Sequence, residues 1–130
     1  DGLVLRRDSN GWQREAKGQT TQALLTVFGR SDQEVYAAGA RGTLLRRSAG
    51  SWQQDNAPQL SARNLVAGSV VPNMDYAFLV ATGGLILRRS GGAWAVDVSG
   101  ISSQELSAVS SPSLTDAFIV GSSGVILHRY

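Results

Sequence analysis

Gly42-Thr43-Leu44-Leu45-Arg46-Arg47 is a hexapeptide that occurs, with small changes, four times in the 130 residues. The spacings between copies are 40, 42 and 40 residues. A fixed period of about 20–50 residues is the sequence signature of a repeat architecture. We therefore expect a chain built from similar units of about 40 residues. The other copies are Gly2-Leu-Val-Leu-Arg-Arg7, Gly84-Leu-Ile-Leu-Arg-Arg89 and Gly124-Val-Ile-Leu-His-Arg129.

Three further landmarks keep the same register as the hexapeptide. A tryptophan follows each of the first three copies, an apolar stretch begins 12 or 13 residues later, and an aromatic residue follows after 12 or 13 more. Apolar residues at fixed repeat positions are typical of a packed core, so we predict that all nine form the structural core of the repeats. They are Trp12, Trp52, Trp94, Leu24, Leu65, Leu106, Tyr36, Phe78 and Phe118.

Each period reads as four short strands. Residues 24–28 and 34–38 are rich in β-forming residues, the hexapeptide places three apolar residues in a row, and the tryptophan begins the fourth segment. The connectors carry Gly, Ser and Asn, which are the residues of tight hairpin turns. No segment of useful length has the period of a helix.

Four antiparallel strands in about 40 residues form the blade of a β-propeller, and the fold class is therefore all-β. We expect one segment, residues 1–130, with units at 1–23 (third and fourth strands), 24–64, 65–105 and 106–130 (first three strands). About three blades cannot close a ring, because propellers typically need 4–8. Either two chains complete the ring or the chain is part of a longer propeller. The units at both ends contain a third strand, so one third strand would be left over in a shared blade. This slightly favours a longer propeller.

The repeat resembles the BNR-type repeats of sialidase-like propellers. The resemblance rests on Leu-x-x-Val, on a short acidic-led strand ending in Gly, on Gly-x-[Ile/Leu]-Leu-Arg and on Gly-x-Trp. It is closest to the non-catalytic branch that includes photosystem II assembly-factor-like proteins. The family's Asp-box turn is degraded here to residues 47–52 (Arg-Ser-Ala-Gly-Ser-Trp), which weakens any catalytic role. The resemblance alone implies a periplasmic or secreted location.

Composition excludes several classes of function. The absence of Cys excludes disulfides and thiolate chemistry, and a net charge of +2 is too small to indicate a nucleic-acid partner. No apolar run is long enough to span a membrane. The single His, His128, stands in the hexapeptide position that Arg fills elsewhere, so we predict no catalytic residues. Scattered carboxylates indicate no metal site and no cofactor.

Arginines at one repeat position are the candidate binding residues. Eleven of the twelve basic residues are Arg, and guanidinium groups suit carboxylate, sulfate or phosphate partners. The alternative is that these arginines pair with Glu15, Asp55 and Asp97 between blades. We predict a non-enzymatic scaffold for protein binding or self-assembly, in the latter case as a homodimer that completes a propeller. The alternatives are a lectin, which could bind an acidic glycan, and a fragment of a sialidase-like enzyme. The candidate arc is Arg7, Arg47, Arg89 and Arg129.

Overall fold

The structure is a computed structural model that describes residues 2–57, 60, 62–98 and 102–130. Its regular structure is β-strand apart from two 3-10 turns in the described residues, Ala40–Gly42 (η1) and Ser122–Gly124 (η2). In the part of the chain that the structure describes, no helix is long and apolar enough to cross a membrane. The strands are β1 (Val4–Asp8), β2 (Gly11–Glu15), β3 (Leu24–Ser31), β4 (Glu34–Gly39), β5 (Leu44–Ser48), β6 (Ser51–Gln54), β7 (Leu65–Val70), β8 (Tyr76–Ala81), β9 (Leu85–Ser90), β10 (Ala93–Val98), β11 (Leu106–Ser110), β12 (Ala117–Gly121) and β13 (Ile126–Arg129).

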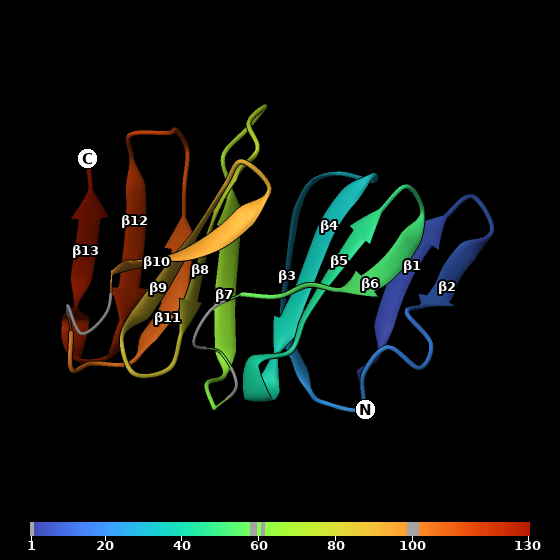
Figure 1. The fold of residues 1–130 in the computed structure, drawn as a ribbon, viewed down its shortest axis with the longest axis horizontal. Coiled ribbons are helices and arrows are strands. Elements are labelled where there is room, and N and C mark those ends of the chain that lie inside the picture. The colour runs from blue at the N-terminus through green and yellow to red at the C-terminus, as the bar shows by residue number, and fades with distance from the viewer. Residues whose placement is uncertain (1, 58–59, 61, 99–101) are drawn as a thin grey trace.

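Consecutive strands pair antiparallel into four sheets. In chain order these sheets contain β1–β2, β3–β6, β7–β10 and β11–β13. Figure 1 shows them standing side by side, from the N-terminal sheet to the C-terminal one. The sheets confirm the prediction of an all-β chain built from about three four-stranded antiparallel blades. Two sheets are complete, and the chain contributes two strands to the first sheet and three to the last.

Strand register places equivalent residues of the repeats at equivalent points of the sheets. The aromatic landmark of each second strand lies opposite the first basic residue of the hexapeptide, in the pairs Tyr36–Arg46, Phe78–Arg88 and Phe118–His128. Each tryptophan lies opposite the second Arg, in the pairs Trp12–Arg7, Trp52–Arg47 and Trp94–Arg89. Residues 40–42 apart in the sequence can therefore be compared directly.

Strand boundaries differ slightly from the sequence-based ranges and between the repeats. β3 continues beyond Phe28 to Ser31, because Gly29 and Ser31 still pair with β4. β12 begins one residue after Asp116, whereas β8 begins at Tyr76, the equivalent of Asp116. The backbone N–H of Asp116 donates to the Ser113 hydroxyl at 3.1 Å, which holds this residue in the preceding turn.

The core lies between neighbouring sheets and not within any one of them. Aliphatic hexapeptide side chains such as Leu45, Leu85 and Leu87 are fully buried. Three apolar clusters join sheet one to two, two to three, and three to four. This arrangement is expected of a blade, because one sheet cannot bury both of its faces alone.

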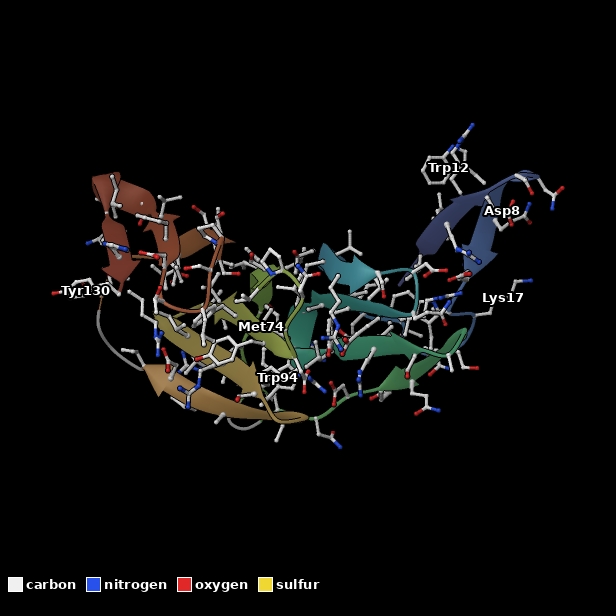
Figure 2. All side chains as sticks on the ribbon, turned by 90° about the horizontal axis from the view of Figure 1, so that it is seen from above. Asp8, Trp12, Lys17, Met74, Trp94 and Tyr130 are labelled. Carbon is white, nitrogen blue, oxygen red and sulfur yellow. The ribbon has the colours of Figure 1, made fainter. Side chains whose placement is uncertain are left out.

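The four sheets follow one another along an open arc. Figure 2 shows Trp12 and Tyr130 near opposite ends of this arc. The first strands of the last three sheets, β3, β7 and β11, lie next to one another. Each sheet thus packs face to face on the next, while the first and last sheets each keep one uncovered face. This is the geometry of an unclosed β-propeller.

In the two complete sheets, close backbone approach requires the glycine that leads the hexapeptide. Gly42 has a φ of 71° and Gly84 a φ of 68°, in the left-handed region that other residues rarely adopt. A Cβ at Gly42 would also meet the carbonyl oxygen of Leu60 at 2.3 Å, and one at Gly84 would meet that of Ser102 at 2.4 Å. The connection to the next sheet passes over each glycine at this point.

Candidate functional site

A contact between an acidic residue and the next sheet recurs at each junction between sheets. At the first junction the Glu15 carboxylate accepts hydrogen bonds from Trp52 Nε1 at 2.8 Å and from Arg47 Nε at 3.1 Å. Burial alone would raise the pKa of Glu15, but these two hydrogen bonds, together with the positive charges of Arg47 and Arg6, lower the pKa overall. The carboxylate therefore stays ionised and links the first sheet to the second.

The second junction repeats the arrangement with one change. Trp94 Nε1 donates to Asp55 Oδ2 at 3.2 Å, and the Trp94 ring meets the ring of Tyr36 edge-on at a centroid distance of 5.8 Å. Arg89 Cζ lies 5.7 Å from the centroid of the same Tyr36 ring. Here Arg89 pairs with Asp75 and not with Asp55.

Glu34 is the centre of a buried charged cluster at this second junction. Its carboxylate accepts hydrogen bonds from the Tyr36 hydroxyl at 2.8 Å and from Arg46 at 2.9 Å, and it also pairs with Arg30. Burial would raise the pKa of Glu34, but the donors and the positive charges lower it. Burial, followed by the hydrogen bond to Glu34, raises the pKa of Tyr36. The repeat gave only a partial signal for this cluster, because the acidic residue at the start of the second strand is present as Glu34 and Asp116 but is replaced by tyrosine at position 76.

The third junction has the acid and the arginine, but the described chain places no tryptophan there. Arg129 Nε lies 3.3 Å from Asp97 Oδ2, and Arg129 Cζ lies 5.6 Å from the centroid of the Phe78 ring. A largely apolar cavity of about 160 Å³ lies between the sheets at this point. Its lining residues are Phe78, Ile86, Asp97, Val98, Ala117, Ile119, Leu127, His128 and Arg129.

The four arginines of the candidate arc have different environments. Arg47 and Arg89 are buried, and both guanidinium groups have carboxylate partners. Arg129 is half-buried beside Asp97, and Arg7 is exposed. The structure therefore does not bring the four together as one open surface. Binding of an external anion by this set stays a prediction, and Arg7 is the member exposed enough to take part without breaking an ion pair.

The predicted core positions differ according to whether a neighbouring sheet covers them. Trp52 and Trp94 are 9% and 7% exposed, whereas Trp12 on the first sheet is 67% exposed. Phe118 on the last sheet is 41% exposed, although its equivalents are almost fully buried. These differences follow from position in the arc. The remaining members, Tyr36, Phe78, Leu65 and Leu106, are buried, and Leu24 is half-buried.

His128 does not sit in a catalytic triad. Its Nε2 lies 3.0 Å from Asp116 Oδ1, and the Ser113 hydroxyl bonds the other oxygen of the same carboxylate at 2.9 Å. A triad needs the imidazole between the nucleophile and the acid, but here the acid lies between the other two. His128 also stacks on Phe118, with ring centroids 4.4 Å apart. Among the described residues no cluster of three or more metal-ligating side chains occurs.

A hollowed apolar surface lies where the two-stranded first sheet leaves part of the second sheet uncovered. Leu5, Leu25 and Val27 are between 51% and 67% exposed. Two cavities, of about 260 and 340 Å³, lie between β1 and the sheet that begins with β3. In the complete sheets the corresponding space beside the third strand is filled by the first and second strands of the same blade.

The fold and these junctions define a β-propeller segment, and solved structures with the same fold support this assignment. YCF48, a photosystem II assembly factor, is similar to the chain in two structures. One is bound to a D1 peptide, with a TM-score of 0.74 and 15% identity over 85% of this chain and 38% of that one. The other is from Cyanidioschyzon merolae, with a TM-score of 0.69 and 20% identity over 85% and 37%.

Virginiamycin B lyase from Staphylococcus aureus is also similar, with a TM-score of 0.70 and 13% identity over 98% of this chain and 48% of that one. The chain thus spans between 37% and 48% of the length of these three proteins. Identities this low show the fold alone. No family model matches the chain, and no curated protein matches it. The likeness to photosystem II assembly-factor propellers is confirmed for the fold, and the BNR resemblance stays a prediction.

Proposed function

We propose that the chain is a non-enzymatic β-propeller scaffold that binds another protein chain through the uncovered apolar surfaces at the two ends of the arc. The N-terminal end face comprises Leu5 and Trp12 of the first sheet together with Leu25 and Val27 of the neighbouring strand β3. The C-terminal end face comprises Phe118, Val120 and Ile126 of the last sheet. The exposure of these apolar residues at both ends of the arc is the observation that carries the proposal.

The N-terminal face has the properties of a protein-binding surface. Contiguous exposed apolar patches with a polar rim mark interaction sites, whereas scattered single residues do not. Leu5, Leu25 and Val27 surround the cavities beside β1, and Arg6 and Arg7 of the same strand are exposed. A partner segment with apolar side chains and an acidic group would complement both the apolar patch and these two arginines.

The C-terminal face offers an apolar surface together with a free strand edge. Phe118 and Val120 are about 40% exposed and Ile126 is 71% exposed. β13 is the last strand of its sheet in the described chain, so its outer backbone groups are available for pairing. Strand addition at such an edge is a common mode of protein binding.

The similar structures are compatible with this proposal and also with an enzymatic role. A YCF48 structure holds a D1 peptide, so a propeller of this kind binds a protein segment. Virginiamycin B lyase is named as an enzyme, so the fold does not decide the question of catalysis. The position of Asp116 between His128 and Ser113 favours the non-enzymatic role for this chain.

Site-specific photo-crosslinking tests the proposal. A benzoylphenylalanine at Val27 or Ile126 lies on an end face, and one at Met74, 44% exposed, lies in the middle of the arc (Figure 2). We expect the two end-face variants to crosslink a protein chain, identified by mass spectrometry, and the Met74 variant to give none. Equal crosslinking at all three positions, or none at either end face, would contradict the proposal.

A further inference from the structure

A polar hollow of about 370 Å³ lies at the first junction, between the loop that follows β2 and the β5–β6 hairpin. Its volume is within the range of pockets that hold small molecules. β2 is the fourth strand of a blade, as β6 and β10 are, so any further strand of the first sheet would pair with β1 and leave the hollow unchanged. The lining residues are Glu15, Ala16, Lys17, Gln19, Gly50, Ser51 and Trp52.

The loop on one side of the hollow is fixed to the second sheet. The side-chain amide of Gln54, on β6, donates to the backbone carbonyl of Gln19 at 2.8 Å. Within the loop the backbone N–H of Gln19 donates to the carbonyl of Ala16 at 3.3 Å. These bonds hold both walls of the hollow in place, so the site is formed without a ligand. A preformed site loses less conformational freedom when it binds.

The backbone beside the hollow is strained at two alanines. Ala16 has a φ of 52° and Ala49, next to Gly50, a φ of 48°, both in the left-handed region. This conformation costs an alanine free energy, because its Cβ crowds the backbone and its side chain offers no compensating hydrogen bond. The third sheet has Gly91 in place of Ala49. Strained residues of this kind concentrate at functional sites.

Glu15 offers the hollow one oxygen that can still accept a hydrogen bond. Its Oε2 accepts from Trp52 Nε1 at 2.8 Å and from Arg47 Nε at 3.1 Å. Within the described residues its Oε1 accepts no hydrogen bond, and the nearest cation, Arg6 Nη1, is 3.6 Å away. The Glu15 side chain is 19% exposed. A hydroxyl group from outside the chain can therefore donate to Oε1.

We propose that this hollow binds a neutral sugar through two adjacent hydroxyl groups. One hydroxyl donates to Glu15 Oε1, and its neighbour accepts from Lys17 or Gln19, because a hydroxyl is both a donor and an acceptor. The charges of Glu15 and Lys17 balance, and the carboxylate disfavours an acidic sugar. Ala16 and Trp52 supply the apolar part of the lining for the C–H groups of the ring. The site goes beyond the proposed protein-binding function, because none of its lining residues belongs to an end face.

Heteronuclear NMR of the isotope-labelled 130-residue chain tests the proposal. The probes are the methyl glycosides of glucose, galactose and mannose, together with N-acetylglucosamine, and N-acetylneuraminic acid is the acidic probe. We expect at least one neutral sugar to bind saturably, with a dissociation constant on the order of 1 mM. Amides of residues 15–19 and 50–52 should shift with the Trp52 indole N–H, which donates to the same carboxylate. The indole resonances of Trp12 and Trp94 should not move.

Two double variants separate the hollow from the rest of the surface. Lys17→Ala with Gln19→Ala removes both side chains that hold the second hydroxyl, and keeps the backbone carbonyl that Gln54 binds. We expect this variant to bind the sugar at least about tenfold more weakly. The matched control is Arg14→Ala with Gln53→Ala, two exposed residues outside the hollow, and it should bind as the wild type does.

Three results would overturn the proposal. The first is that no neutral sugar shifts the Trp52 indole resonance. The second is that N-acetylneuraminic acid binds more tightly than every neutral sugar, which would show that the ligand is acidic. The third is that the double variant at residues 17 and 19 binds as tightly as the control, which would place the sugar elsewhere on the chain.

Discussion

Replacing Trp52 by alanine removes the side chain that seals the first junction. Trp52 is 9% exposed and packs against Ala37 and Leu45. A buried aromatic side chain covers about 200 Å², which corresponds to about 5 kcal/mol at about 25 cal/mol per Å². The methyl group of the alanine and partial collapse of the cavity recover part of this free energy. We therefore expect Trp52→Ala to lower the free energy of unfolding by about 3–5 kcal/mol.

A graded series separates packing from the hydrogen bond. Trp52→Phe keeps most of the ring but loses the N–H that donates to Glu15, so we expect a loss of about 1.5 kcal/mol. Met74→Ala, at a 44% exposed turn residue, should stay within about 0.5 kcal/mol of the wild type. Urea unfolding followed by circular dichroism measures all three. If Trp52→Ala costs no more than Met74→Ala, Trp52 does not seal the junction.

Two further changes test the charged junctions and the packing between sheets. The pKa values of Glu15 and Glu34 are lowered in the folded chain, so their contribution is present above the usual value of about 4.5 and is lost as pH falls through the folded values. The urea midpoint of unfolding should therefore fall as the pH is lowered from 7 to 3. Glu34→Gln should make this decline less steep. An equally steep decline in that variant would show that Glu34 does not contribute to the pH dependence. Gly68→Ala would place a Cβ 2.1 Å from the Phe28 ring and should cost about 1–3 kcal/mol. Adding Phe28→Leu should recover part of this loss, and an additive double variant would argue against the contact.

The strand pattern could be predicted because the period in the sequence and the period in the sheets are the same. The hexapeptide, the tryptophan and the aromatic landmark occupy fixed register positions, and this is why their spacing indicated four strands in each unit. The antiparallel order and the incomplete first and last sheets follow from the same spacing.

The environments of individual residues could not be predicted from the repeat. Trp12 and Trp52 share a position, but their exposure differs because burial depends on the preceding sheet. Arg89 pairs with Asp75, a residue of its own sheet, and this departs from the pattern of Arg47 with Glu15. The cavity beside Phe78 and Asp97 is visible only once the side chains of two sheets are placed together.

Sedimentation equilibrium of the wild-type chain over nanomolar to high-micromolar concentrations is the most direct measurement. An open arc with two apolar end faces should associate, and we predict a species of twice 13.7 kDa in the micromolar range. Dissociation on dilution should be matched by a fall in thermal stability, because both end faces become exposed again. A compact 13.7 kDa monomer at every concentration, with a single cooperative unfolding transition, would contradict the open-propeller interpretation.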